Sequence, residues 1–196
     1  MPFIAFLGCD GSGKSAVIKA VSGRLDESGT AVTQGHWRPQ ALTRRVEVPA
    51  IPADNPHGLP PRGLVSSILK LGWLWLNWWK GWYQGLRKAS RGGVVLFDRY
   101  HSDLLVDPRR YRYGGPMILA RLASRAMPQP DLVIFLDAPP EVLLSRKQEV
   151  DRASLERSRS GYRNLCGSHP RFRVVDASRP LAEVVDSVVE LVRAGC

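Results

Sequence analysis

Hydrophobic and polar positions follow one another along the chain in blocks that favour an α/β fold. Five short strand-like runs alternate with segments of helical periodicity: residues 3–7, 31–35, 93–97, 131–136 and 172–176. This alternation is typical of a parallel sheet covered by helices. A length of 196 residues fits one domain over 1–196. We expect the functional loops to follow the carboxyl ends of the strands.

The junction after the first run carries the strongest chemical signal. GCDGSGKS, residues 8–15, fits G-x-x-x-x-G-K-[ST] at every fixed position, between a predicted strand and a predicted helix. This context indicates a P-loop, in which backbone N–H groups and the helix N-terminus bind phosphates. Lys14 would reach the β and γ phosphates, and Ser15 would hold Mg²⁺. The predicted nucleotide-binding residues are Gly8, Asp10, Gly11, Ser12, Gly13, Lys14, Ser15 and Ala16.

A P-loop binds a nucleotide without defining the reaction. The chain has no N-K-x-D string, which a GTPase switch would use to read its base. Two predicted strands end in Asp98 and Asp137, and neither residue is followed by the Glu of a typical ATPase. These absences favour a small phosphotransferase using ATP and Mg²⁺. A nucleotide-dependent binding or regulatory protein is the non-enzyme alternative.

Four segments together resemble the thymidylate kinase family, in the right order and over most of the chain. They are GCDGSGKS, GGVVLFDRY at 92–100, DLVIFLDAPPEVLLSRK at 131–147 and RVVDASRPLAEVVDSVVELV at 173–192. The resemblance implies a P-loop NTPase fold with a five-stranded parallel sheet, helices on both faces and an Arg-rich lid at about 146–160. It also implies transfer of the ATP γ-phosphate to a small acceptor.

The resemblance suggests roles for individual residues. Asp98 would organise Mg²⁺ with Ser15. Arg99 would grip the acceptor, typically through a phosphate, and Asp10 would accept a hydrogen bond from an acceptor hydroxyl. Arg146 would flank the adenine, and the turn from Ala177 and Ser178 to Pro180 would border its other side. The residues expected in catalysis are Asp10, Lys14, Asp98, Arg99, Arg146 and Arg152.

The lid arginines enter this set because Gly11 stands where some family members carry a catalytic arginine. Members without that arginine supply one from the lid, and this lid contains Arg146, Arg152, Arg157 and Arg159. Closing arginines neutralise the charge of the transferred phosphoryl group. Arg152 has a second interpretation, as the partner of Glu156 one turn away on a solvated helix.

The acceptor side departs from the family. HWRPQAL, 36–42, keeps only Arg38-Pro39 of R-E-P-G-G, and the arginine that contacts thymine falls near Asn77, with no arginine from 63 to 86. The family's S-x-x-A-Y-Q is replaced at 101–116. We expect an acceptor site containing Asp10, Arg38, Asn77, Arg99 and His101, and poor use of dTMP. A phosphorylated sugar, a glycan end or an unusual nucleotide fits these residues. Genuine dTMP kinase and a sugar or glycan kinase of surface polysaccharide synthesis are alternatives.

Five of the six tryptophans lie in LGWLWLNWWKGWY, 71–83. Helical spacing places Trp75, Trp78, Trp79 and Trp82 on one stripe. We expect the stripe to pack in the core or in a dimer interface, and we expect the chain to form a homodimer through this helix. An acceptor wall and peripheral contact with a membrane surface are the alternatives; a membrane span is not expected. Before it, residues 38–63 are rich in proline, which is typical of a functional or flexible loop on the acceptor side.

Net charge is +10 with a pI near 10.1, which favours anionic partners. A small or glycan-like anionic acceptor explains this charge better than nucleic acid does, because a phosphate-binding loop is present. Cys9, Cys166 and Cys196 are scattered and show no metal-binding spacing, so a reduced, cytoplasmic compartment is expected.

Overall fold

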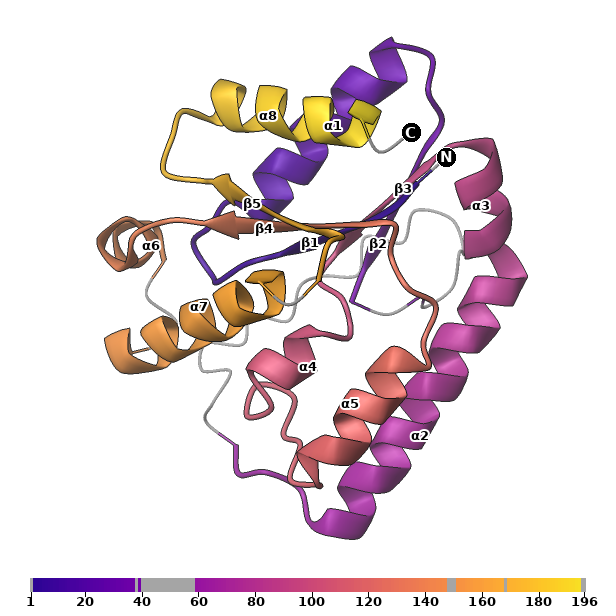
Figure 1. The fold of residues 1–196 in the computed structure, drawn as a ribbon, viewed down its shortest axis with the longest axis vertical. Helices are drawn as coiled ribbons and strands as arrows, with labels where there is room; N and C mark the ends of the chain where they lie inside the picture. The colour runs from indigo at the N-terminus through magenta and orange to yellow at the C-terminus, as the bar shows by residue number, and fades with distance from the viewer. Residues whose placement is uncertain (1, 38, 40–58, 148–150, 168, 195–196) are drawn as a thin grey trace.

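The protein folds around a parallel sheet (Figure 1). The computed structural model describes residues 2–37, 39, 59–147, 151–167 and 169–194. Within these residues one five-stranded sheet has the order β2-β3-β1-β4-β5. Its strands are β1 (Phe3–Leu7), β2 (Val32–His36), β3 (Val94–Asp98), β4 (Leu132–Asp137) and β5 (Phe172–Asp176). The predicted fold class is confirmed, and the strand ends differ from the expected ones by one residue at most.

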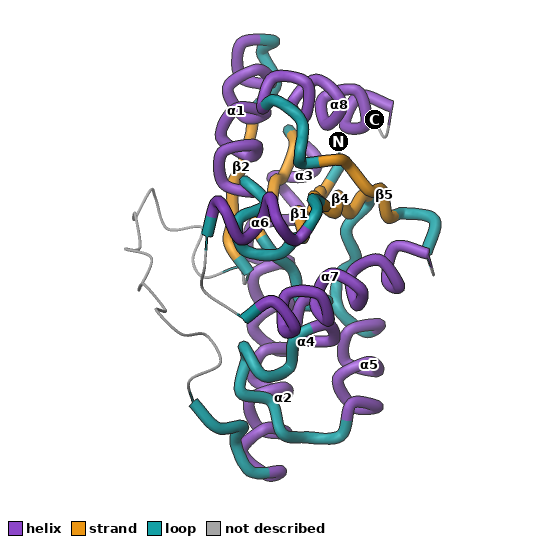
Figure 2. Tube along the Cα trace, turned by 90° about the vertical axis from the view of Figure 1, so that its left-hand side faces the viewer, coloured by secondary structure: helices purple, strands orange, loops and turns teal. Residues whose placement is uncertain are grey.

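Helices cover both faces of the sheet. α1 (Lys14–Glu27) and α8 (Leu181–Ala194) pack together on one face (Figure 1). The other face carries α2 (Leu64–Gly81), α4 (Asp103–Val106), α5 (Met117–Arg125) and α7 (Arg152–Gly167) (Figure 2). The π-helical turn η1 (Trp82–Leu86) and α3 (Arg87–Gly92) continue α2 towards β3, and α6 (Pro140–Arg146) follows β4.

The strand register gathers the sequence motifs at one edge of the sheet. β1 lies between β3 and β4, so the P-loop that follows it has a strand end on each side. Asp98 ends β3 opposite Phe6 and His36, and Asp137 ends β4 opposite Asp176. Because all the strands are parallel, their carboxyl ends meet where ligands bind in open α/β sheets.

The helix α2 packs one face into the core. Its buried positions are Ser67, Leu71, Leu74, Trp78 and Gly81, alternately four and three residues apart. The Trp78 ring is fully buried and lies 5.3 Å from the Phe97 ring and 4.9 Å from the Tyr100 ring, between centroids. The expected tryptophan stripe is therefore not uniform. Trp78 is a core residue, whereas Trp75, Trp79 and Trp82 are half-buried at its sides.

Two predicted loops fall partly outside the described residues. Of the proline-rich segment 38–63, the structure describes Pro39 and residues 59–63. Of the predicted lid, residues 148–150 lie outside, and α7 continues past residue 160 to Gly167. Among the helices that the structure describes, none is both long and apolar enough to cross a membrane.

Replacing Trp78 should test the core contribution of α2. We expect Trp78→Ala to lower the free energy of unfolding by about 3–5 kcal/mol, because removing a fully buried ring leaves a cavity between α2 and the sheet. Trp73 on the same helix is 47% exposed, so Trp73→Ala should cost about 1 kcal/mol or less. Urea unfolding followed by circular dichroism measures both, and equal losses would contradict this packing.

Candidate functional site

The P-loop contains three glycines with positive φ angles. These are Gly8 at +156°, Gly11 at +83° and Gly13 at +79°. A Cβ atom at Gly11 would lie 2.5 Å from the Leu143 carbonyl oxygen, closer than a side chain allows. The P-loop of this chain therefore has no room for an arginine at position 11. Any arginine that neutralises a transferred phosphoryl group has to come from another element.

Lys14 lies over the P-loop, close to its backbone. Its Nζ donates to the carbonyl oxygens of Gly8 and Cys9, both at 2.9 Å, and to Ser12 Oγ at 3.3 Å. Its side chain is buried, and burial lowers the pKa of Lys14 to about 8. The ammonium group is thus held by oxygens beside the loop, where it could exchange them for phosphate oxygens.

Ser15 and Asp98 meet although 83 residues separate them. Ser15 Oγ donates to Asp98 Oδ2 at 3.5 Å. Asp98 Oδ1 is buried and has no hydrogen-bond partner among the described residues. A hydroxyl and a carboxylate beside a phosphate-binding loop fit Mg²⁺, which takes few protein oxygens and fills its shell with phosphates and water. The described residues contain no group of three or more His, Cys, Asp or Glu that could hold a metal ion.

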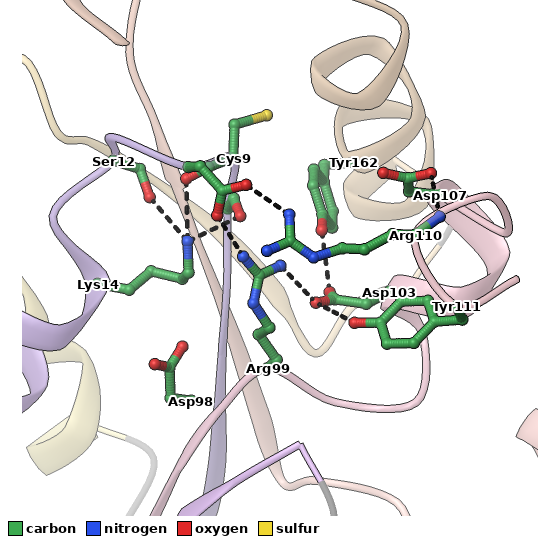
Figure 3. A network of polar contacts seen from close by, with 12 residues as sticks. Cys9, Ser12, Lys14, Asp98, Arg99, Asp103, Asp107, Arg110, Tyr111 and Tyr162 are labelled. Carbon is green, nitrogen blue, oxygen red and sulfur yellow. Dashed lines mark hydrogen bonds and ion pairs between the residues drawn. The ribbon is translucent and has the colours of Figure 1, made fainter. Parts of the chain in front are cut away.

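Figure 3 shows Arg99 and Arg110, which come from different elements, and both of them donate to the Asp10 carboxylate. Arg99, directly after β3, places Nη2 2.5 Å from Asp10 Oδ1. Arg110, from the loop between α4 and α5, donates through Nη1 to Asp10 Oδ2. Burial alone would raise the pKa of Asp10, but both guanidinium groups hold that pKa well below its usual range. Asp10 is therefore ionised at neutral pH and bridges two cations.

Asp103 holds Arg99 from the opposite side. Arg99 Nη1 donates to Asp103 Oδ2 at 3.0 Å, and the same carboxylate accepts from Tyr162 on α7 at 3.0 Å and from Tyr111 at 3.3 Å. Arg99 is buried and has φ +67°, a left-handed conformation that costs energy for a residue with a Cβ. The strain is offset by two carboxylates, and such strain clusters at functional sites.

A small cavity of about 20 Å³ lies between the P-loop, Arg99, Arg110, Tyr111 and α7. Its volume has room for roughly one water molecule. The Trp37 ring stacks on the Tyr111 ring beside it, with centroids 4.8 Å apart and planes 14° apart. Lys70 on α2 donates through Nζ to the Tyr111 carbonyl oxygen at 2.6 Å.

The two segments expected at the adenine lie together. Arg146, at the end of α6, donates through Nη1 to the Ala177 carbonyl oxygen at 2.9 Å. Ser178 donates through its N–H and Oγ to Asp176 Oδ1, at 2.9 and 2.5 Å, which stabilises the turn after β5. Arg146, Ala177 and Ser178 could therefore flank one planar group.

The lid arginines divide into two sets. Arg152 is largely exposed and pairs with Glu141 at 2.6 Å and Glu156 at 2.9 Å, so its alternative interpretation as an ion-pair partner is the arrangement observed. Arg159 and Arg163 instead reach the P-loop side of the sheet. Arg159 Nε and Arg163 Nη2 each lie 2.6 Å from an oxygen of Asp137, which is buried at the end of β4.

Known proteins align with the chain from end to end. The thymidylate kinase of Nitratidesulfovibrio vulgaris (strain Miyazaki F) is 30% identical over 222 residues, covering 98% of this chain and 96% of that protein. The chain belongs to the thymidylate kinase family. The thymidylate kinase of Chlamydia caviae is 25% identical, with 95% of each chain covered. No family model matches the chain. Membership assigns kinase-type phosphoryl transfer to this thymidylate kinase-like chain and leaves its acceptor open.

The residues expected at the acceptor have three different locations. Asp10 and Arg99 are in contact. Asn77 is half-buried on the face of α2 that also carries Lys70 and Gly81, and these two residues meet Tyr111 and Pro39 on the acceptor side. Arg38 lies outside the described residues.

His101 does not reach the cavity. Its side chain is fully buried, and neither ring nitrogen has a hydrogen-bond partner among the described residues. The chain turns after Arg99, so a residue only two positions later points into the interior. This position does not support the expected contact with an acceptor.

Several residues of the site were not predicted. Arg110 and Tyr111 lie in DPRRYRYGG, residues 107–115, where arginines alternate with tyrosines; this is a signal for an anion-binding loop, but it does not identify the partner of either residue. Asp103 follows Arg99 by four residues, a spacing that would have suggested their ion pair had a helical turn been expected there. No sequence signal links Asp103 to Tyr162.

His101 should make the fold sensitive to acid. Burial lowers the pKa of His101 to about 4, whereas an unfolded histidine titrates near 6.5. As the pH falls, the imidazole therefore becomes protonated in the unfolded chain before it does so in the folded protein. This lowers the free energy of unfolding by about 3 kcal/mol between pH 6.5 and pH 4. In His101→Leu this part of the loss should vanish. Urea unfolding at about pH 7.5 and about pH 4.5 compares the two proteins; equal losses would contradict a neutral buried imidazole.

Proposed function

We propose that the protein transfers the γ-phosphate of ATP, with Mg²⁺, to a small acceptor that carries a hydroxyl and an anionic group, preferably a phosphate. The observation that carries this proposal is the convergence of Arg99 and Arg110 on the Asp10 carboxylate beside the P-loop. Two guanidinium groups around one oxyanion form a site that also suits phosphate.

The Asp10 carboxylate takes the place that an acceptor phosphate would occupy. An incoming phosphate would compete with Asp10 for Arg99 and Arg110, because both arginines donate to one carboxylate. Asp10, released from one or both of them, would then be available to accept the acceptor's hydroxyl proton or a hydrogen bond from it. Asp103 keeps Arg99 in position throughout, since its carboxylate is buried and also accepts from Tyr162.

The donor side follows the same principle of charge neutralisation. Lys14 would bind the β and γ phosphates, and Ser15 and Asp98 would hold Mg²⁺. Bound Mg²⁺ supplies charge neutralisation on the phosphate oxygens. Among the lid arginines, Arg159 is best placed to contribute further positive charge at these oxygens. Its guanidinium forms an ion pair with Asp137, next to the P-loop. Arg146 and Ala177 would enclose the adenine.

The preferred acceptor in this proposal is a molecule other than dTMP. No arginine stands in α2 where the family's thymine-contacting residue is expected, and a site lacking a polar contact discriminates poorly in favour of its ligand. The stacked Trp37 and Tyr111 rings favour an acceptor with a ring that could lie against them, such as a sugar or a base. The second candidate is dTMP itself, favoured by relatives named thymidylate kinase at 30% and 31% identity.

A coupled ADP-release screen tests the reaction and the acceptor class. It should cover dTMP, dUMP, other nucleoside monophosphates, nucleosides and sugar phosphates. We expect phosphorylated acceptors to stimulate ADP release and dTMP to give kcat/KM below about 10⁴ M⁻¹s⁻¹. Lys14→Ala and Asp98→Ala should each lower turnover by about a hundredfold or more, since they remove charge neutralisation at the donor phosphates. ATP binding without stimulation by any acceptor would favour a regulatory protein, and efficient use of dTMP would refute the acceptor proposal.

Two adjacent arginines give a matched test of the anion site. Arg110 contacts Asp10 and lines the cavity, whereas Arg109 is exposed. With the best phosphorylated acceptor, Arg110→Gln should raise KM for the acceptor at least about tenfold and leave KM for ATP unchanged, because one charged contact of 1.5–3 kcal/mol is lost. Arg109→Gln should behave as wild type. Equal effects would show that only the charge of the loop matters.

A further inference from the structure

His36 and Asp98 lie side by side at the carboxyl ends of two neighbouring strands. They are partners in the register of β2 and β3, and the Trp37 N–H donates to the Asp98 carbonyl oxygen at 2.8 Å. His36 Nε2 lies 3.9 Å from Asp98 Oδ2, which is too far for a hydrogen bond. The strand backbones therefore hold an imidazole beside this carboxylate without a hydrogen bond between the two groups.

The residue before His36 helps to define this arrangement. Gly35 is the partner of Phe97 in the register, and a Cβ atom at Gly35 would lie 2.3 Å from the Phe97 ring. Gly35 therefore leaves space that the Phe97 side chain occupies on one face of the sheet. Because successive side chains of a strand point to opposite faces, His36 and Asp98 share the other face.

Ser15 places a third donor at the same carboxylate. Its Oγ donates to Asp98 Oδ2 at 3.5 Å, the oxygen that His36 Nε2 also approaches. Two donors that each lie about 2.1 Å from one cation are roughly 3–4 Å apart. The separations of 3.5 Å and 3.9 Å fall in this range. The hydroxyl, the carboxylate and the imidazole are therefore spaced as ligands of one cation.

An imidazole ligand changes which metal ions a site prefers. Mg²⁺ takes an octahedral shell of oxygen ligands, whereas imidazole suits first-row transition metals. Histidine ordinarily titrates at about pH 6.5, so above neutral pH its ring offers a lone pair to a cation. A site that combines carboxylate, hydroxyl and imidazole groups therefore favours a transition metal ion over Mg²⁺.

A surface ion pair is the simpler interpretation of the position of His36. The ring is charged only when it is protonated, and 69% of its side chain is exposed, so an ion pair with Asp98 would contribute little to stability. Such a pair also leaves the buried Asp98 Oδ1 without a hydrogen-bond partner among the residues that the structure describes. A cation at the carboxylate would reach that oxygen directly or through its water shell, and it would use the imidazole as well.

We propose that His36 is a ligand of the metal site formed with Ser15 and Asp98, and that this site therefore binds divalent first-row transition metals more tightly than Mg²⁺. The inference rests on the proposed function, in which Ser15 and Asp98 hold the metal that accompanies ATP. Phosphate oxygens and water would complete the coordination shell. The exposed position of His36 leaves its ring free to turn towards a bound cation.

Electron spin echo envelope modulation of bound Mn²⁺ tests this coordination directly. The full chain is mixed with MnCl₂ and inorganic tripolyphosphate, which offers phosphate oxygens to the P-loop and contains no nitrogen. We expect modulation from a directly bound nitrogen nucleus in the wild type and its loss in His36→Ala. The control is His169→Ala, which removes another exposed histidine, before the amino end of β5, and should keep the modulation. Asp98→Ala should weaken Mn²⁺ binding, and circular dichroism should show that all the variants are folded.

Competition between Mn²⁺ and Mg²⁺ measures the preference itself. Mn²⁺ stands at the weak end of the transition-metal series, so a preference for it is a strict test. His36→Ala should lower the ratio of Mn²⁺ affinity to Mg²⁺ affinity at least about tenfold. His36→Asp should bind Mg²⁺ at least as tightly as the wild type and still lose the preference, because it supplies an oxygen ligand instead of a nitrogen.

Two results would overturn the proposal. One is wild-type protein that binds Mn²⁺ without nitrogen modulation, or modulation that persists in His36→Ala. The other is unchanged metal binding by His36→Ala together with a raised KM for the acceptor, which would assign His36 to the acceptor instead. The metal measurements use no acceptor, so their failure is distinguishable from failure of the ADP-release screen that tests the proposed function.

Discussion

The site is organised around one partly buried carboxylate, Asp10, which accepts from two guanidinium groups. It connects the P-loop to Arg99 directly after β3 and to Arg110 in the loop after α4. Arg99 is buried, and a buried charge is tolerated only with partners, so Arg99 requires its carboxylates. The ion pairs therefore align a nucleotide-binding loop with the side of the molecule where an acceptor would enter. They also leave little open space there, because the carboxylate already occupies the position suited to an anion.

A second carboxylate extends this arrangement into the lid helix. Asp103 holds Arg99 and accepts a hydrogen bond from Tyr162, so α7 is tied to the same network. On the other side of the P-loop, Asp137 holds Arg159 and Arg163 from α7. Arginines that could serve phosphoryl transfer are thus paired with carboxylates that phosphates could replace.

The tryptophan-rich segment has two different faces. Inward, Trp78 fills the core between α2 and the sheet; outward, Trp73 remains exposed. The helix therefore stabilises the fold through one face and leaves large apolar side chains exposed on the other.

The sequence by itself determined the parts of the protein whose signals are local. The P-loop, the five strands, and Asp98 at a strand end could be predicted, because each rests on a few consecutive residues with fixed spacing. Parallel strands then brought Ser15 to Asp98, as expected from the motifs. His101 follows Arg99 by two residues, but this adjacency does not define which way its side chain points after a turn, and the side chain is buried. Only the tertiary structure decided that Arg110 pairs with Asp10, 100 residues away, and that Tyr162 meets Asp103, 59 residues away. Such pairs depend on how separate elements pack against one another. Neither hydrophobic periodicity nor composition contains information about contacts between residues so far apart in the sequence.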